Sequence, residues 1–185
     1  VLNPGLSGNF PWLSNLAQNY SKFRWISLRY IYVPACSTAS AGVEWLYFKY
    51  DYLDNAPASL SDVMASDTSC MGNVWFGQPI NDATAFSPRL PVAENVNVDL
   101  DVDKLTRDWY YVRTGNNANQ PVTTTLGGVV PGGLTVSTDN IYDDVARPGI
   151  IYYGNSGTAG SALNGYLFAA YTIEFCEPTT STINS

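Results

Sequence analysis

Two aspartates that follow an apolar, aromatic run are the residues best suited to chemistry. Asp51 and Asp54 stand in the stretch FKYDYLDNAPAS. Residues three positions apart across a turn have Cα atoms within about 7 Å. Their carboxylates could therefore approach to roughly 5 Å, which costs on the order of 3 kcal/mol at an effective dielectric near 20. A divalent cation between them would remove this repulsion, and calcium tolerates the irregular geometry of a turn.

The pair cannot complete a calcium site alone. Two Asp side chains supply at most about four oxygens, whereas calcium takes about 6–8, and no EF-hand-like run of further ligands follows. Water, backbone carbonyls or another stretch, including one from a second subunit, would have to supply the rest. The alternative is that Asp54 caps a turn and Asp51 ends a strand in solvent. Spacing alone leaves both interpretations open.

The chain contains no histidine, which excludes Ser-His-Asp and Cys-His arrangements and His-ligated zinc. Its Gly-Gly pairs lack the lysine and the spacing of a phosphate-binding loop. A glycosidase would need two carboxyl groups about 5–9 Å apart in a cleft. Glu44 and Glu174 are the one glutamate pair that falls on predicted strands. The sequence therefore favours a role that is not enzymatic.

Acidic residues outnumber basic ones, 16 to 9, and the formal net charge is −7. The Lys and Arg residues are scattered singly, so this stretch offers no basic patch for a phosphate backbone. Charged residues make up 14% of the chain, below the roughly 25% of typical domains. A surface poor in charge and rich in Tyr and Trp often meets another protein surface. No apolar run approaches the ~20 residues of a membrane span, so we expect no membrane partner.

The three cysteines, Cys36, Cys70 and Cys176, are odd in number and lack the spacing of a metal site. We interpret them as free, mostly buried thiols in a reducing compartment, with a disulfide as the alternative.

Period-two patterning dominates the chain after its first residues. Residues 9–20 predict a short helix with Pro11 in its first turn, and residues 59–65 predict a capped helical turn or two. Strands are predicted over 23–33, 43–52, 73–76, 92–105, 108–114, 150–153 and 166–176. With about eight strands and one or two short helices in the connections, the chain is predicted to be all-β. We expect one domain over residues 1–185, an eight-stranded antiparallel jelly-roll sandwich.

Other acidic and aromatic residues have plainer interpretations. Asp99, Asp101 and Asp103 alternate with apolar residues, which predicts a solvated strand face, or less often a contact with a neighbour. The pair Asp143-Asp144 predicts an exposed loop, with a second cation site as the alternative. The tryptophans are interpreted as core or interface residues, with a sugar-stacking platform as the alternative: Trp12, Trp25, Trp45, Trp75 and Trp109.

Several short stretches resemble one protein family. FPWLS (10–14), KFRW (22–25), LRY (28–30) and YVPAC (32–36) occur in the order found in shell domains of small icosahedral plant RNA-virus coat (capsid) proteins. YDYLD (50–54), followed by Ala56-Pro57, resembles the calcium-binding Asp-x-x-Asp motif of that group, and Trp109-Tyr110 matches a further position. The sobemovirus-like members, related to tombusviruses, fit best. Lys49 stands where tombusvirus-like relatives tend to have an additional Asp, so a two-metal site is not expected.

The resemblance implies a ligand set and a way of assembly. Asp51 and Asp54 would be side-chain ligands of calcium, and the neighbouring subunit would contribute the carbonyl around Tyr110 and Asn184. The family implies self-assembly into an icosahedral T=3 shell of about 180 quasi-equivalent copies. A basic N-terminal arm upstream of Val1 would contact the single-stranded RNA. The protein would be part of the virion and would assemble in the host cytoplasm, with calcium as a stability and swelling switch. The rival interpretation is a jelly-roll, calcium-dependent carbohydrate-binding module similar to a lectin.

Overall fold

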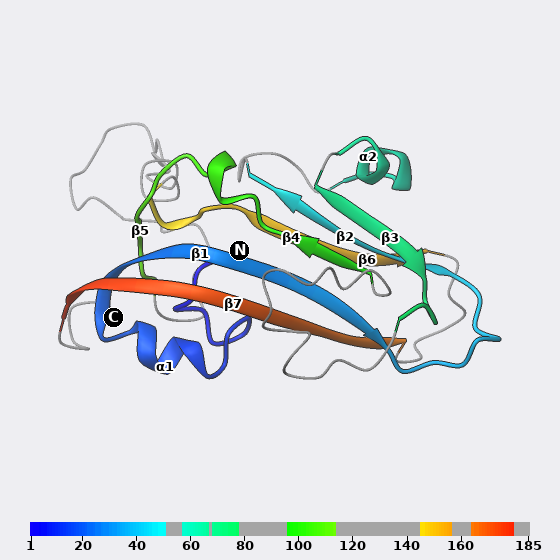
Figure 1. Cartoon of the computed structure of the whole chain (residues 1–185), viewed down its shortest axis with the longest axis horizontal. Helices are drawn as coiled ribbons and strands as arrows, with labels where there is room; N and C mark the ends of the chain where they lie inside the picture. Colours follow the sequence, from blue (N-terminus) through cyan, green and yellow to red (C-terminus); the bar gives the residue numbers. More distant parts are fainter. Residues whose placement is uncertain (51–56, 67, 78–95, 114–144, 157–163, 180–185) are drawn as a thin grey trace, which may run out of the picture. The chain divides into compact units, whose positions relative to one another are not determined.

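The computed structural model describes residues 1–50, 57–66, 68–77, 96–113, 145–156 and 164–179. These residues contain seven strands, two short α-helices and one 3₁₀ helix (Figure 1). The elements in chain order are α1 (Leu13–Ala17), β1 (Tyr20–Pro34), β2 (Val43–Lys49), α2 (Leu60–Met64), β3 (Ser69–Asn73), β4 (Asn97–Asp99), η1 (Val102–Lys104), β5 (Tyr110–Tyr111), β6 (Ile150–Ser156) and β7 (Gly165–Pro178).

The strands form two sheets. One has the order β4-β1-β5, with β7 also paired to β1, and the other has the order β3-β2-β6. β1 runs antiparallel to β4 and to β5, with Tyr30 opposite Val98 and Phe23 opposite Tyr110. β2 runs antiparallel to β3, with Trp45 opposite Met71. The long β1 and β7 lie side by side in Figure 1.

The chain divides into two units, and the division falls within β1, β6 and β7. Unit 1 comprises residues 1–24, 106–150 and 174–185. Its described core contains Phe10, Leu13 and Ala17, which recur at helical spacing. The start of β1 and the whole of β5 belong to the same unit. The rings of Phe23 on β1 and Tyr110 on β5 lie 6.0 Å apart and are both completely buried.

Unit 2 comprises residues 25–105 and 151–173, and it contains two sheets that face each other. Tyr30 on β1 meets Phe48 on β2 with ring centroids 5.9 Å apart. Tyr32 on β1 stacks on Tyr153 of β6 and donates its hydroxyl hydrogen to the carbonyl of Val74 at 2.7 Å. Side chains from both inner faces therefore share one apolar interior, as in a β-sandwich.

Period-two patterning predicted the main strands correctly. Along β2 every second side chain is buried. On β1 the buried positions are Phe23 and Trp25, then Leu28 and Tyr30, and then Ile31 and Tyr32 in succession. The alternation on β1 thus shifts by one residue between Trp25 and Leu28, so a single strict period could not have described it. The prediction of an all-β antiparallel sandwich is confirmed. The prediction of one domain over residues 1–185 stays a prediction.

Several predicted strands are wrong in their bounds. Of the predicted strand 108–114, only Tyr110–Tyr111 is a strand, and residue 114 lies outside the described residues. Residues 74–76 are not a strand, since β3 ends at Asn73 and a turn follows. Of the predicted strand 92–105, residues 92–95 lie outside the described residues, and only Asn97–Asp99 is a strand. The chain then leaves the sheet and forms η1. Asp101 caps this 3₁₀ helix by accepting a hydrogen bond from the backbone of Asp103 at 3.2 Å.

Candidate cation site and the residues that flank it

Three of the four predicted calcium ligands, Asp51, Asp54 and Asn184, lie outside the residues that the structure describes. Tyr110 is described and belongs to unit 1. Its ring is completely buried, and its hydroxyl lies 3.2 Å from the Thr106 Oγ1 and accepts a hydrogen bond from the Arg107 backbone at 3.1 Å. The Tyr110 side chain is therefore a core group, and only backbone atoms at this position could serve as cation ligands.

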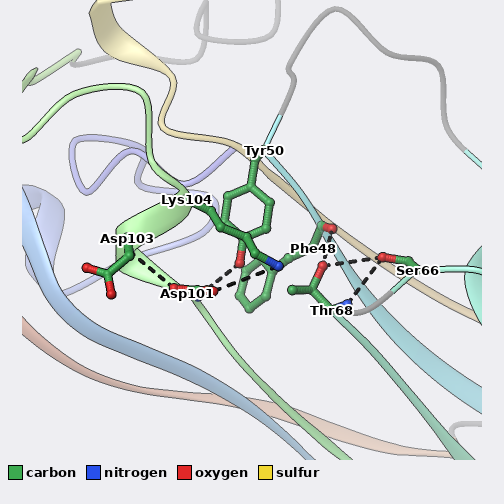
Figure 2. A network of polar contacts seen from close by, with 7 residues as sticks. All are labelled: Phe48, Tyr50, Ser66, Thr68, Asp101, Asp103 and Lys104. Carbon is green, nitrogen blue, oxygen red and sulfur yellow. Dashed lines mark hydrogen bonds and ion pairs between the residues drawn. The ribbon is translucent and has the colours of Figure 1, made fainter.

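The residue that precedes Asp51 is held firmly. The hydroxyl of Tyr50 accepts a hydrogen bond from the backbone N–H of Asp101 at 2.9 Å. The Lys104 ammonium lies 5.8 Å from the centre of the Tyr50 ring, within reach of a cation–π interaction. Lys104 also pairs with the Asp101 carboxylate at 3.8 Å. Figure 2 shows that Tyr50 from the end of β2 meets the η1 segment through these contacts.

A second group of contacts in Figure 2 holds the end of β2 to the segment after α2. The backbone N–H of Phe48 donates to the Thr68 carbonyl at 3.1 Å, and the Thr68 hydroxyl donates to the Phe48 carbonyl at 3.1 Å. The hydroxyls of Ser66 and Thr68 lie 3.3 Å apart. Both main-chain groups of Phe48 are thus satisfied by one residue, which fixes the strand two positions before Tyr50.

The segment that follows the Asp pair is fixed by a helix cap. The Asp62 carboxylate accepts hydrogen bonds from the backbone of Ala58 at 3.0 Å and of Ser59 at 2.9 Å. The Ser59 hydroxyl accepts one from the backbone of Asp62 at 3.3 Å, which completes a capping box. Val63 on α2 is buried and anchors the short helix. The stretch that carries Asp51 and Asp54 therefore begins and ends at anchored residues.

The three alternating aspartates do not share one strand face, which corrects the prediction made for them. Asp99 on β4 forms a two-pronged ion pair with Arg29 on β1, in which the second contact is 2.7 Å long. Asp101 caps η1, and Asp103 lies exposed within it. The prediction assumed that one strand carries all three aspartates. Because β4 ends at Asp99, the side chains beyond it no longer alternate between the two faces of a strand.

The two glutamates considered for a glycosidase belong to different units and have different environments. Glu44 is completely buried on the inner face of β2 in unit 2. Glu174 belongs to unit 1 and pairs with Arg24 at 2.7 Å. A carboxyl group sealed in a sandwich interior cannot reach a sugar substrate.

Two basic side chains of unit 1, Lys22 and Arg24, are matched by carboxylate partners. Lys22 pairs with Glu177 at 2.6 Å and lies 5.2 Å from the Tyr111 ring centre. Arg24 pairs with Glu174 and lies 5.1 Å from the Trp109 ring centre. The hydrogen bond that Lys22 donates to Glu177 is the main reason that the pKa of Lys22 is raised. Because these two cations are already paired with carboxylates, this part of the surface does not resemble one that binds phosphates.

The described residues contain no group of three or more Cys, Asp or Glu side chains that could hold a metal ion. Cys36, Cys70 and Cys176 are free, as predicted, but all three are half-buried rather than mostly buried. Cys36 donates a hydrogen bond to the Val74 carbonyl at 3.2 Å. Among the tryptophans, Trp25 is a core residue and Trp12 is 72% exposed. No helix in the described part is long and apolar enough to cross a membrane.

Sequence reasoning missed Asn3, a buried polar residue whose side chain makes four hydrogen bonds. It is 1% exposed, and its amide donates to the carbonyls of Tyr111 at 2.9 Å and Ala146 at 2.8 Å. Its side-chain oxygen accepts from the backbones of Gly5 at 3.0 Å and Arg113 at 3.2 Å. A single asparagine near the start of the chain gives no periodic signal, so only the folded structure reveals this role.

Comparison with known proteins supports one family. The family model described as viral coat protein (S domain) matches residues 1–181. The capsid protein of Tobacco necrosis virus (strain A) is 30% identical over 173 residues, which cover 94% of this chain and 56% of the relative. The capsid protein of Tobacco necrosis virus (strain D) is 28% identical, and this chain covers 58% of its length. The chain spans little more than half the length of these curated relatives.

Solved structures agree with this assignment. A Tobacco necrosis virus structure superimposes with a TM-score of 0.73 at 27% identity, with 94% of this chain and 82% of that chain covered. Cocksfoot mottle virus gives a TM-score of 0.72 at 16% identity, which supports the fold alone, over 100% of this chain and 86% of that chain. The fold is that of a capsid jelly roll. The chain belongs to the viral coat protein S-domain family.

Proposed function

We propose that this chain is the shell-forming part of a coat protein that self-assembles into an icosahedral capsid around single-stranded RNA. Family membership over residues 1–181 is the observation that carries this proposal. The virion would be its location, and the host cytoplasm the site of assembly. The copy number expected from the family is about 180, by quasi-equivalent packing of identical chains.

The surface of the chain supports self-association. Tyr166, Leu167 and Phe168 follow one another on β7 and are 54%, 38% and 50% exposed. Successive side chains of a strand point to opposite faces, so both faces of β7 present apolar groups here. Scattered single apolar residues on a surface are ordinary, but a contiguous group favours contact with another protein. A second copy of the same chain is the partner that the family predicts.

We propose further that calcium ties neighbouring subunits together at Asp51 and Asp54. The neighbour would complete the site with a backbone carbonyl near Tyr110 and with Asn184. The anchored residues on either side, Tyr50 and the α2 cap, support this because they fix both ends of a short acidic segment. When calcium is removed and both carboxylates are ionised, their repulsion would push the boundary apart. Low pH would replace calcium in part by protonating them.

The experiment compares assembled particles of the full-length protein. Asp51→Asn with Asp54→Asn removes two charges from the site. Asp103→Asn with Asp108→Asn removes two charges from exposed positions in the described part and is the matched control. Light scattering and electron microscopy would follow particle diameter as a chelator is added at neutral pH. Wild type and control should expand and the site variant should not respond, whereas ordinary chelator-induced expansion of the site variant would refute the latch.

RNA contact is proposed to depend on a basic arm upstream of Val1. Two described cations of unit 1, Lys22 and Arg24, are paired with carboxylates. Binding of RNA by the full-length protein should therefore weaken steeply with salt, and the segment 1–185 alone should show little such binding.

A calcium-dependent carbohydrate-binding module remains the alternative function. It would need accessible aromatic side chains beside the cation, and Trp12 is the most exposed tryptophan of the described residues. Binding of a defined glycan that requires both calcium and Trp12, in a protein that forms no closed shells, would favour that alternative.

A further inference from the structure

One acidic side chain of unit 2 is buried in the sandwich interior. Glu44 is 0% exposed and shares the inner face of β2 with Leu46 and Phe48, which are also fully buried. Among the described residues it is the one Asp, Glu, Lys or Arg side chain in the buried core. The cation latch proposed above makes no use of it.

The surroundings of Glu44 satisfy only part of its carboxyl group. The Asn164 amide donates a hydrogen bond to Oε1 at 3.1 Å. The other oxygen, Oε2, is buried without a hydrogen-bond partner among the described residues. The Tyr153 hydroxyl on β6 lies near enough to favour the charged form of Glu44, although no hydrogen bond satisfies Oε2.

The ionisable groups that face this carboxyl come from both sheets. They are Tyr32 on β1 and Tyr153 on β6, with the Cys36 thiol beside Tyr32. In the described part of unit 2, none of the groups that act on Glu44 is a lysine or arginine. An ionised Glu44 would therefore be a buried charge without a counter-charge, which is far more costly than a buried neutral acid.

Burial raises the pKa of Glu44, and the hydrogen bonds with Asn164 and Tyr153 oppose this only in part. The same environment acts on its neighbour: burial, followed by the charge of Glu44, raises the pKa of Tyr153 to about 12. Both shifts have the sign expected for acids held in a poorly solvated interior.

We propose that Glu44 is a buried proton switch in unit 2, which packs as a neutral acid between the two sheets and weakens their packing when it ionises. This inference does not rest on calcium binding. It adds a source of pH sensitivity inside each subunit, separate from the carboxylates proposed at the subunit boundary.

The direction of the pH effect follows from linkage. The folded state holds the Glu44 proton more tightly than the unfolded chain, so the contribution of Glu44 to the stability of unit 2 is fully present below the ordinary pKa of glutamate. Stability then falls as the pH rises toward the raised pKa of the folded state. Within that window the unfolding equilibrium constant should increase by up to about tenfold per pH unit. Above the window the loss should stay constant.

The test uses urea unfolding of the full-length protein from about pH 4 to about pH 9, with calcium in excess so that the proposed latch stays occupied. Glu44→Gln keeps the size of the side chain and an oxygen that can accept from Asn164. The matched control is Glu174→Gln, because Glu174 is a half-exposed glutamate in unit 1. Wild type and Glu174→Gln should lose stability across the window, and Glu44→Gln should lose less. Equal slopes for wild type and Glu44→Gln would overturn the proposal.

A second measurement covers the case in which Glu44→Gln does not fold. Infrared titration of the wild-type protein should detect a protonated carboxyl band that persists above the ordinary range for glutamate. Tyr153→Phe removes a hydroxyl that favours the charged form, so the loss of that band should move to higher pH. If every carboxyl band is lost by about pH 5, Glu44 is ionised in the folded protein and the proposal fails.

Discussion

Replacing Tyr50 by Phe should weaken calcium binding by the full-length protein while leaving the fold intact. The change removes one hydrogen bond, that from the Asp101 N–H to the Tyr50 hydroxyl at 2.9 Å. The ring remains, so the Lys104 contact at 5.8 Å is retained. A neutral hydrogen bond of this kind contributes about 1 kcal/mol to stability. If holding Tyr50 orders Asp51 for binding, the same energy would appear as a roughly fivefold higher dissociation constant.

The assay is calorimetric titration of chelator-treated particles with calcium, together with urea unfolding of the same protein. Tyr47→Phe is the matched control, since it removes the same hydroxyl from a half-buried Tyr on β2 in the same unit, whose ring stacks on Tyr152. The control should bind calcium as wild type does. If Tyr50→Phe loses about 1 kcal/mol of stability with unchanged calcium affinity, the anchor does not act on the site and the reasoning is refuted.

Two further predictions concern stability. Asn3→Ala leaves the partners of four buried or part-buried hydrogen bonds unmatched, so urea unfolding should show a loss of about 3–5 kcal/mol. Asn3→Asp keeps one accepting oxygen but turns a carboxylate oxygen toward the carbonyls of Tyr111 and Ala146, so it should lose at least as much at neutral pH. A loss for Asn3→Ala below about 1 kcal/mol would show that water replaces the amide. Gly165→Ala should destabilise unit 2 by about 1–3 kcal/mol, because an added Cβ would overlap the Val33 carbonyl and lie 2.5 Å from the Tyr32 ring. A melting temperature equal to that of wild type would contradict this steric argument.

Local sequence signals predicted the elements that depend on local patterns. The alternation of β2 and the Ser59–Asp62 spacing of α2 are visible in the sequence and recur in the structure. The end of β4 was not predictable in this way, because Asp101 continues the alternation but leaves the sheet to cap η1. Capping and strand pairing compete for the same short polar residue, and tertiary context decides between them.

The residues around the candidate site were harder to predict than the site residues. The spacing of Asp51 and Asp54 is a local motif, whereas Tyr50 and Asp101 are 51 positions apart. Asn3 reaches partners 108 and 143 positions away. Contacts over such separations leave no trace in a single sequence, although they decide how firmly a local motif is held.

Six acids of the described chain fall into three environments that respond differently to pH and salt, and Asp103 and Asp108 are simply exposed. Asp99, Glu174 and Glu177 are part-exposed partners of cations, and such pairs contribute little and weaken with salt. Asp62 and Asp101 cap helices. Glu44 alone is sealed in the core. A stability loss on raising pH that persists at high salt and with calcium in excess therefore cannot come from the surface pairs, and it should not come from an occupied cation site. That residual loss is the part that the buried carboxyl explains, so the core switch and the boundary latch can be measured separately in one protein.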